Sequence, residues 1–130
     1  MSYQDKIREF EKMHKKAAEC KCWETALNRV YYHLFLRAKS FLIDKKFNYR
    51  RFLSGYEKHE TDPEFSHSTM QAALVLFLNT NYPNVDTKPL FQYGKVLDYR
   101  ISADYFEDKH TEVSYNIALE LAKKIIKQLP

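Results

Sequence analysis

Apolar side chains recur at helical spacing along most of this sequence, most regularly between Trp23 and Asp44. Residues three, four and seven positions apart share one side of an α-helix, so such a run predicts an amphipathic helix. The stripe comprises Leu27, Val30, Tyr31, Leu34, Phe35, Ala38, Phe41 and Leu42. Its length and regularity predict the central helix of the core.

Further helices are predicted on both sides of this one. The first spans about Gln4–Ala18, and the last begins near Thr111, a suitable N-cap residue that an acidic first turn follows. Between them, the stretch "MQAALVLFL" is apolar on almost every side. It predicts a helix that begins near Pro63 or Ser66, ends at Asn79 and is buried on more than one side.

A fourth main helix is expected to begin near Thr87–Pro89, because proline is well tolerated in the first turn. It continues through Ile101, after a loop rich in Asn, Asp and Pro. Gly94 inside this helix costs about 1 kcal/mol relative to alanine. We therefore expect Gly94 to mark a close approach between two helices.

Residues 46–66 break the helical periodicity, so we expect a long connection with one short helical turn. Aromatic and basic side chains alternate there, among them Arg50 and Arg51 in "NYRRF". This is the composition of a surface for single-stranded nucleic acid. The pattern also includes Tyr56, Lys58 and His59. The alternative is an insertion that packs apolar side chains on the bundle, namely Phe47, Phe52 and Leu53.

Composition points to one domain over residues 1–130 with a helical fold. The chain is 45% hydrophobic and 29% charged, which is ordinary for a globular protein of this length. It has only two glycines and four prolines, whereas strand-rich folds need turn residues at short intervals. The predicted fold class is all-α, an antiparallel bundle of four main helices plus an accessory helix.

The net charge of +4 is compatible with RNA or DNA as a partner, although basic residues also serve solubility. The sequence shows neither a secretory signal nor an apolar run that could span a membrane, so we expect a cytoplasmic protein. Cys20 and Cys22 lie one residue apart and are expected to be reduced thiols. No motif calls for a metal or an organic cofactor.

The stretch "LDYRISADYFED", residues 97–108, holds the main candidate site. On a helix, Arg100 and Asp104 can form an exposed ion pair worth about 0.3–0.5 kcal/mol. Alternatively, the Arg100 guanidinium can bind a phosphate through two parallel hydrogen bonds. Catalysis needs a further group that transfers protons, and the phenol of Tyr105 suits this role less well than a histidine.

Three stretches, "WETALNRVYYHLFLRAKSFL", "SHSTMQAALVLF" and "VLDYRISADYFED", together resemble the HEPN superfamily, in particular its small stand-alone bacterial and archaeal members. The matching positions are Tyr31–Tyr32 with Phe35, then His67–Ser68, then Arg100 with Ala103–Asp104–Tyr105. The likeness covers roughly residues 10–129. It implies an antiparallel helical bundle that dimerises.

The resemblance also implies a chemistry. Many members are metal-independent ribonucleases of toxin–antitoxin, CRISPR or phage-defence systems, with arginines and histidines of two protomers in one cleft. The RNA 2′-hydroxyl is the nucleophile, so the protein supplies positioning and proton transfer. In this family the histidine follows the arginine by four to six residues.

This chain departs from the family pattern at that histidine. Positions 105–107 are Tyr, Phe and Glu, and the nearest downstream histidine, His110, lies beyond the predicted helix. In one toxin subgroup, a nucleotidyltransferase partner modifies a tyrosine two residues past the histidine with AMP; the corresponding residue here is Glu107. Tyr105 is therefore the candidate stand-in for the missing histidine.

Other polar residues have two interpretations each. His33 can complete a cross-helix site with Arg100, or it can be a surface histidine on the polar face of its helix. Asn28 and Arg29 can line the same groove or face solvent. His67 can belong to a helix cap or to a site.

The leading hypothesis is therefore an RNA-binding HEPN-family homodimer of a toxin–antitoxin or defence system. Its catalytic candidates are Arg100, Asp104 and Tyr105, and its nucleic-acid-binding candidates are Arg29, His33, Arg50 and Arg51. The rival hypothesis is a non-catalytic adaptor that binds a nucleotide, a nucleic acid or a nucleotidyltransferase partner. A third is a helical subunit of a larger complex.

Overall fold

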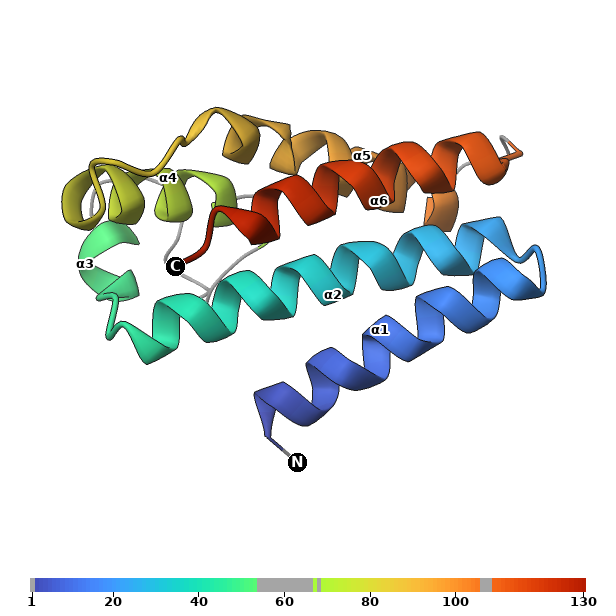
Figure 1. Cartoon of the computed structure of the whole chain (residues 1–130), viewed down its shortest axis with the longest axis horizontal. Coiled ribbons are helices and arrows are strands. Elements are labelled where there is room, and N and C mark those ends of the chain that lie inside the picture. Colours follow the sequence, from blue (N-terminus) through green and yellow to red (C-terminus); the bar gives the residue numbers. More distant parts are fainter. Residues whose placement is uncertain (1, 54–66, 68, 106–108) are drawn as a thin grey trace.

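A computed structural model describes residues 2–53, 67, 69–105 and 109–130. These residues form helices and no strands, which confirms the all-α fold class (Figure 1). In chain order the elements are α1 (Tyr3–Glu19), α2 (Trp23–Asp44), α3 (Tyr49–Leu53), α4 (Met70–Asn81), the 3₁₀ helix η1 (Lys88–Gln92), α5 (Tyr93–Tyr105) and α6 (Glu112–Lys127). None of the helices in these ranges is both long and apolar enough to cross a membrane.

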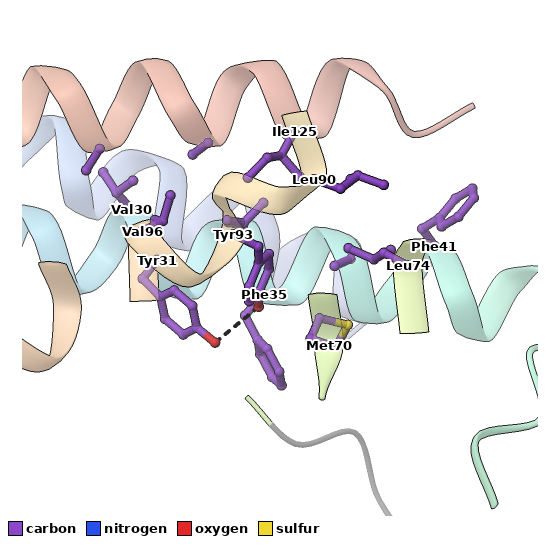
Figure 2. Packing of buried hydrophobic residues seen from close by; sticks show 14 of the residues in the cluster. Val30, Tyr31, Phe35, Phe41, Met70, Leu74, Leu90, Tyr93, Val96 and Ile125 are labelled. Atoms are coloured by element: carbon purple, nitrogen blue, oxygen red, sulfur yellow. Dashed lines mark hydrogen bonds between the residues drawn. The ribbon is translucent and has the colours of Figure 1, made fainter. Parts of the chain in front are cut away.

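Helix α2 is the centre of the bundle, since α1, α4, α5 and α6 all contact it. α1 folds back along one side of α2 as an antiparallel hairpin, and α6 follows the other side (Figure 1). Every residue of the predicted α2 stripe is buried. Figure 2 shows this stripe meeting side chains of the later helices, including Leu74, Tyr93, Val96 and Ile125. The predicted bounds and buried face of α2 are therefore confirmed.

Helix α4 begins later than predicted, at Met70, because His67 and Thr69 adopt turn conformations, and it runs to Asn81. It buries one face, through Met70, Ala73, Leu74 and Leu78. Leu76 is 49% exposed, so the prediction of burial on more than one side is wrong for this position. The physical reason is that α2 and η1 contact α4 while Leu76 faces solvent.

The segment before α5 also differs from the prediction. Lys88–Gln92 forms a 3₁₀ helix with Pro89 in its first turn, and the α-helix begins only at Tyr93. Gly94 does not mark a tight approach: a Cβ atom there would lie 3.7 Å from Gln71 Oε1, an ordinary contact. The Gly94 N–H instead donates a hydrogen bond of 3.1 Å to that oxygen, so α4 satisfies a backbone donor in the first turn of α5.

Two helices end on a lysine in the left-handed region, where glycine is the usual residue. These are Lys21 after α1, with φ 59°, and Lys46 after α2, with φ 57°. At the second site, the N–H of Phe47 donates to the carbonyl of Leu42 over 2.9 Å. This six-to-one bond is the mark of a Schellman motif, which satisfies carbonyl groups that the helix end leaves without partners.

The connection after α2 contains the predicted short helical turn, α3. Phe47 and Phe52 pack against the core, with ring centroids 5.7 Å apart, and Phe47 meets Phe77 of α4 at 5.9 Å. These contacts support the packing interpretation of this segment. Its other named residues, Tyr56, Lys58 and His59, lie outside the described ranges, as does the side chain of Leu53.

Candidate functional site

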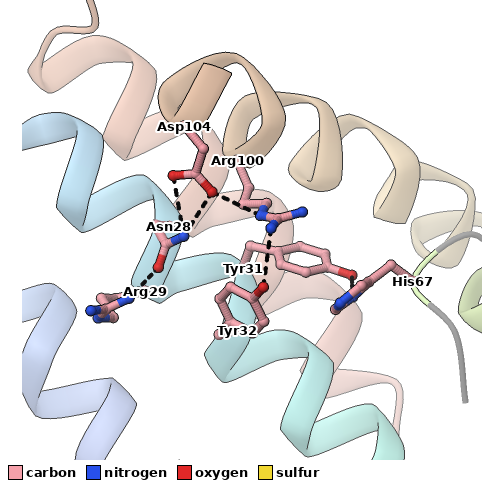
Figure 3. Close-up of polar contacts among 7 residues, drawn as sticks. All are labelled: Asn28, Arg29, Tyr31, Tyr32, His67, Arg100 and Asp104. Atoms are coloured by element: carbon pink, nitrogen blue, oxygen red, sulfur yellow. Dashed lines mark hydrogen bonds and ion pairs between the residues drawn. The ribbon is translucent and has the colours of Figure 1, made fainter. Parts of the chain in front are cut away.

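Arg100 lies where α5 packs on α2, and its side chain is only 16% exposed. Three tyrosine rings surround the guanidinium: its Cζ is 5.3 Å from the ring centre of Tyr32 and 6.0 Å from those of Tyr31 and Tyr105. One NH2 group donates a hydrogen bond of 3.1 Å to the Tyr32 hydroxyl (Figure 3). Aromatic faces attract a cation, so these rings stabilise the charged arginine inside the fold.

The predicted ion pair with Asp104 is present, with 3.0 Å between Arg100 Nε and Asp104 Oδ2. The two halves of the pair differ in exposure: the Arg100 side chain is largely covered where α5 packs on α2, whereas Asp104 is an exposed residue at the end of α5 whose side chain is 25% exposed. Asn28 of α2 donates to both Asp104 carboxylate oxygens, at 3.2 and 3.0 Å. The carboxylate is therefore held between Asn28 and Arg100.

Arg100 still has unused hydrogen-bonding capacity. Its Nε is buried and faces Asp104 Oδ2 at 3.0 Å, so a ligand could use only the N–H groups of the two terminal nitrogens. A guanidinium has five N–H donors, and within the described part of the chain Arg100 uses one of them, in the hydrogen bond to Tyr32. The remaining terminal donors suit an oxyanion such as a phosphate, which arginine binds with two parallel bonds.

His67 approaches the same tyrosines from the turn before α4 (Figure 3). Its Nδ1 lies 2.6 Å from the Tyr31 hydroxyl, and its ring centre is 5.3 Å from that of Tyr31 and 5.7 Å from that of Tyr32. It also contacts Phe35, with ring centres 4.3 Å apart. Arg100 and His67 therefore both border the Tyr31–Tyr32 pair.

Burial sets the direction of the hydrogen bonds that lead to His67. Tyr93 is 1% exposed, and its hydroxyl lies 3.1 Å from that of Tyr31, its one hydrogen-bond partner within the described ranges. A buried hydroxyl should not leave its proton without an acceptor, so we infer that Tyr93 donates to Tyr31 and Tyr31 donates to His67 Nδ1. Burial raises the pKa of both phenols, so they stay protonated. The neutral His67 ring then carries its proton on Nε2.

The remaining candidates occupy different places. Arg29 joins the network, because its NH1 donates to Asn28 Oδ1 and its guanidinium lies 5.6 Å from the Phe10 ring centre. Tyr105 is 71% exposed at the end of α5. Arg51 is exposed on α3, and its backbone N–H donates to Asn48 over 3.0 Å. The side chain of Arg50 lies outside the described part of the chain.

His33 meets neither expectation from the sequence. It faces α1 rather than Arg100, with Nε2 3.6 Å from Glu11 Oε2 and its ring centre 6.0 Å from that of His14. Its side chain is 14% exposed, so it is not a surface histidine either. α1 covers this side of α2, and the resulting burial lowers the pKa of His33. His110 is also engaged elsewhere, with Nε2 3.1 Å from Ser102 Oγ.

The cluster therefore combines an anion-binding group, Arg100, with a histidine that can exchange protons, His67. The described residues contain no group of three His, Cys, Asp or Glu side chains that could hold a metal ion. Comparisons with protein-family models, with curated proteins and with solved structures found no match. The chemistry must therefore be argued from the cluster itself.

Proposed function

We propose that this chain is a HEPN-family RNA-binding protein that works as a cytoplasmic homodimer in a toxin–antitoxin or defence system and cleaves RNA without a metal. The supporting observation is that Arg100 and His67 border the same two tyrosines, Tyr31 and Tyr32. These four residues are among the positions that carry the resemblance to the family. They come from three separate stretches of sequence.

In this proposal, Arg100 binds the phosphate that is to be cleaved through its terminal N–H groups, of which one donates to Tyr32 within the described ranges. His67 exchanges protons through Nε2, the function for which the family uses a histidine shortly after the arginine. An imidazole suits this because its unperturbed pKa, about 6.5, is close to neutrality. The exposed ring of Tyr105 beside the guanidinium suits stacking on a base next to the bound phosphate.

The test is cleavage of labelled single-stranded RNA in EDTA by the wild type and by the variants Arg100→Ala, His67→Gln and Tyr105→Phe. We expect His67→Gln to lower the rate at least about a hundredfold, the usual contribution of an acid–base group, and Arg100→Ala to lower it by about as much through lost electrostatic stabilisation of the phosphate. Tyr105→Phe should keep most of the rate. Attack by the 2′-hydroxyl also requires a cyclic phosphate on the upstream product.

Matched controls are available. Arg8→Ala removes an exposed arginine whose partner is Asp5, and His110→Gln removes a histidine outside the cluster. Both should cleave like the wild type, and light scattering should give a dimer mass for all variants. Full cleavage by Arg100→Ala, or dependence on a divalent metal, would contradict the proposal.

One observation favours the adaptor as a second candidate. The Arg100 charge already has a counter-ion, Asp104, which Asn28 holds in place. Such a pair can serve binding alone, with a nucleotide, a nucleic acid or a nucleotidyltransferase partner as the occupant. If no variant cuts RNA while Arg100→Ala still abolishes RNA or nucleotide binding, the adaptor is the better description.

A further inference from the structure

A cavity of about 430 Å³ lies between α1, α2 and α6, and it shares no residue with the Arg100 cluster. Its apolar wall is formed by Val30 of α2 and by Leu119, Ala122 and Ile126 of α6. Pockets of this size, with an apolar wall and a few polar groups, are typical of sites for small organic molecules.

The charges around this cavity are strongly unbalanced. Lys15, Arg37, Lys123 and Lys127 line it, and Glu11 is the only carboxylate among its lining residues. Four cations and one carboxylate give the lining residues a net charge of +3, whereas the net charge of the whole chain is +4. The excess charge of the protein is thus largely gathered around one opening.

The single carboxylate is already engaged. Glu11 lies 3.0 Å from Lys15 Nζ and 3.6 Å from His33 Nε2. Arg37, Lys123 and Lys127 have no carboxylate within ion-pair distance in the described ranges. These three cations are exposed and line the same opening, so an anion held there would be attracted by all of them.

Two histidines at the same cavity strengthen this inference. His14 is 2% exposed, and its Nδ1 lies 2.9 Å from the Tyr115 hydroxyl. Burial lowers its pKa to about 4, and the positive charges of Lys15 and Lys123 act in the same direction. Burial and the charge of Arg37 lower the pKa of His33, against the effect of Glu11. Both rings are therefore neutral near pH 7, so they add hydrogen-bonding groups to the cavity without changing its net charge.

We propose that this cavity binds a small organic anion, an aromatic or aliphatic body that carries a phosphate or carboxylate group. The acid group lies between Arg37, Lys123 and Lys127, and the body rests on the apolar wall. This site is separate from the RNA-binding cluster and does not depend on the function proposed for it.

The first experiment is isothermal titration calorimetry with naphthyl phosphate, naphthoate, neutral naphthol and inorganic phosphate. We expect naphthyl phosphate or naphthoate to bind at least tenfold more tightly than naphthol and inorganic phosphate, because only the organic anions use both the cations and the wall. Preference between these two probes identifies the acid group as a phosphate or a carboxylate. No binding of either probe at millimolar concentration overturns the proposal.

The second experiment compares Lys123→Glu with Lys124→Glu, the same charge reversal at neighbouring exposed positions of α6, of which only the first lines the cavity. Lys123→Glu should weaken binding at least tenfold, and Lys124→Glu less than twofold, with unchanged circular dichroism spectra. If both variants bound the probe equally weakly, the cause would be the general charge of the protein, and the proposed site would be wrong. Arg100→Ala should bind the probe like the wild type, which separates this site from the RNA-binding cluster.

Discussion

Acid should destabilise this fold through one histidine of α1. His14 is 2% exposed, and its pKa in the folded protein is about 4, against an ordinary value of 6.5. Between these two values, the unfolded chain binds a proton at this position that the folded chain does not. The contribution is therefore fully present above pH 6.5 and is lost as the pH falls toward 4.

The size of the effect follows from the shift. A difference of this size between folded and unfolded pKa corresponds to about 3 kcal/mol when complete, of which about 2 kcal/mol falls between pH 7 and pH 5. These values are upper limits, because the cavity beside His14 admits water and screens the charged ring.

The assay is urea unfolding of the wild type and His14→Gln at pH 7 and at pH 5. Glutamine can still hydrogen-bond to Tyr115 but does not titrate, so the wild type should lose about 2 kcal/mol more than the variant on acidification. The subtraction removes the contributions of the other histidines and the carboxylates. Parallel losses in the two proteins would refute the burial argument for His14.

Three further predictions concern stability. Asp104→Asn should cost about 1–2 kcal/mol in thermal unfolding, because it leaves the mostly buried Arg100 without its counter-ion; an unchanged melting temperature would argue against the pair. Leu74→Ala, at a fully buried site, should cost about 2–5 kcal/mol in urea unfolding, whereas Leu76→Ala should stay within about 0.5 kcal/mol; equal costs would mean that α4 faces the core differently. Lys46→Gly should raise stability by about 0.5–1 kcal/mol, because glycine has no Cβ penalty at its left-handed φ of 57°; a lower melting temperature would contradict this.

The helices were predictable where a long apolar stripe determines one buried face. α2 matches its predicted bounds, and its stripe from Leu27 to Leu42 occupies most of its length. The beginnings of α4 and α5 were not predictable in this way. They depend on the turn at His67 and Thr69 and on the 3₁₀ helix at Pro89. Neither feature produces a periodic pattern of apolar residues in the sequence.

The candidate site was predictable only in its local part. The spacing of Arg100 and Asp104 predicts their ion pair, since residues four apart share a helix face. The burial of Arg100 depends on α2, whose position no local pattern specifies. The same holds for His67, whose contact with Tyr31 joins two residues that lie 36 positions apart in the sequence. His33 was misjudged because α1 covers a side of α2 that looks polar in the sequence.

The placement of α1 has a consequence for how the molecule opens. Its main contact is with α2, through a hairpin whose turn contains Lys21. A helix docked mainly on one neighbour can detach without disrupting the rest of the core, so α1 should open as a cooperative unit before α2 does. Native-state hydrogen exchange should show its amides losing protection before those of α2, and equal protection would exclude this. Since α1 also forms one wall of the cavity, a ligand bound there would contact both α1 and the rest of the bundle and would slow the detachment of α1.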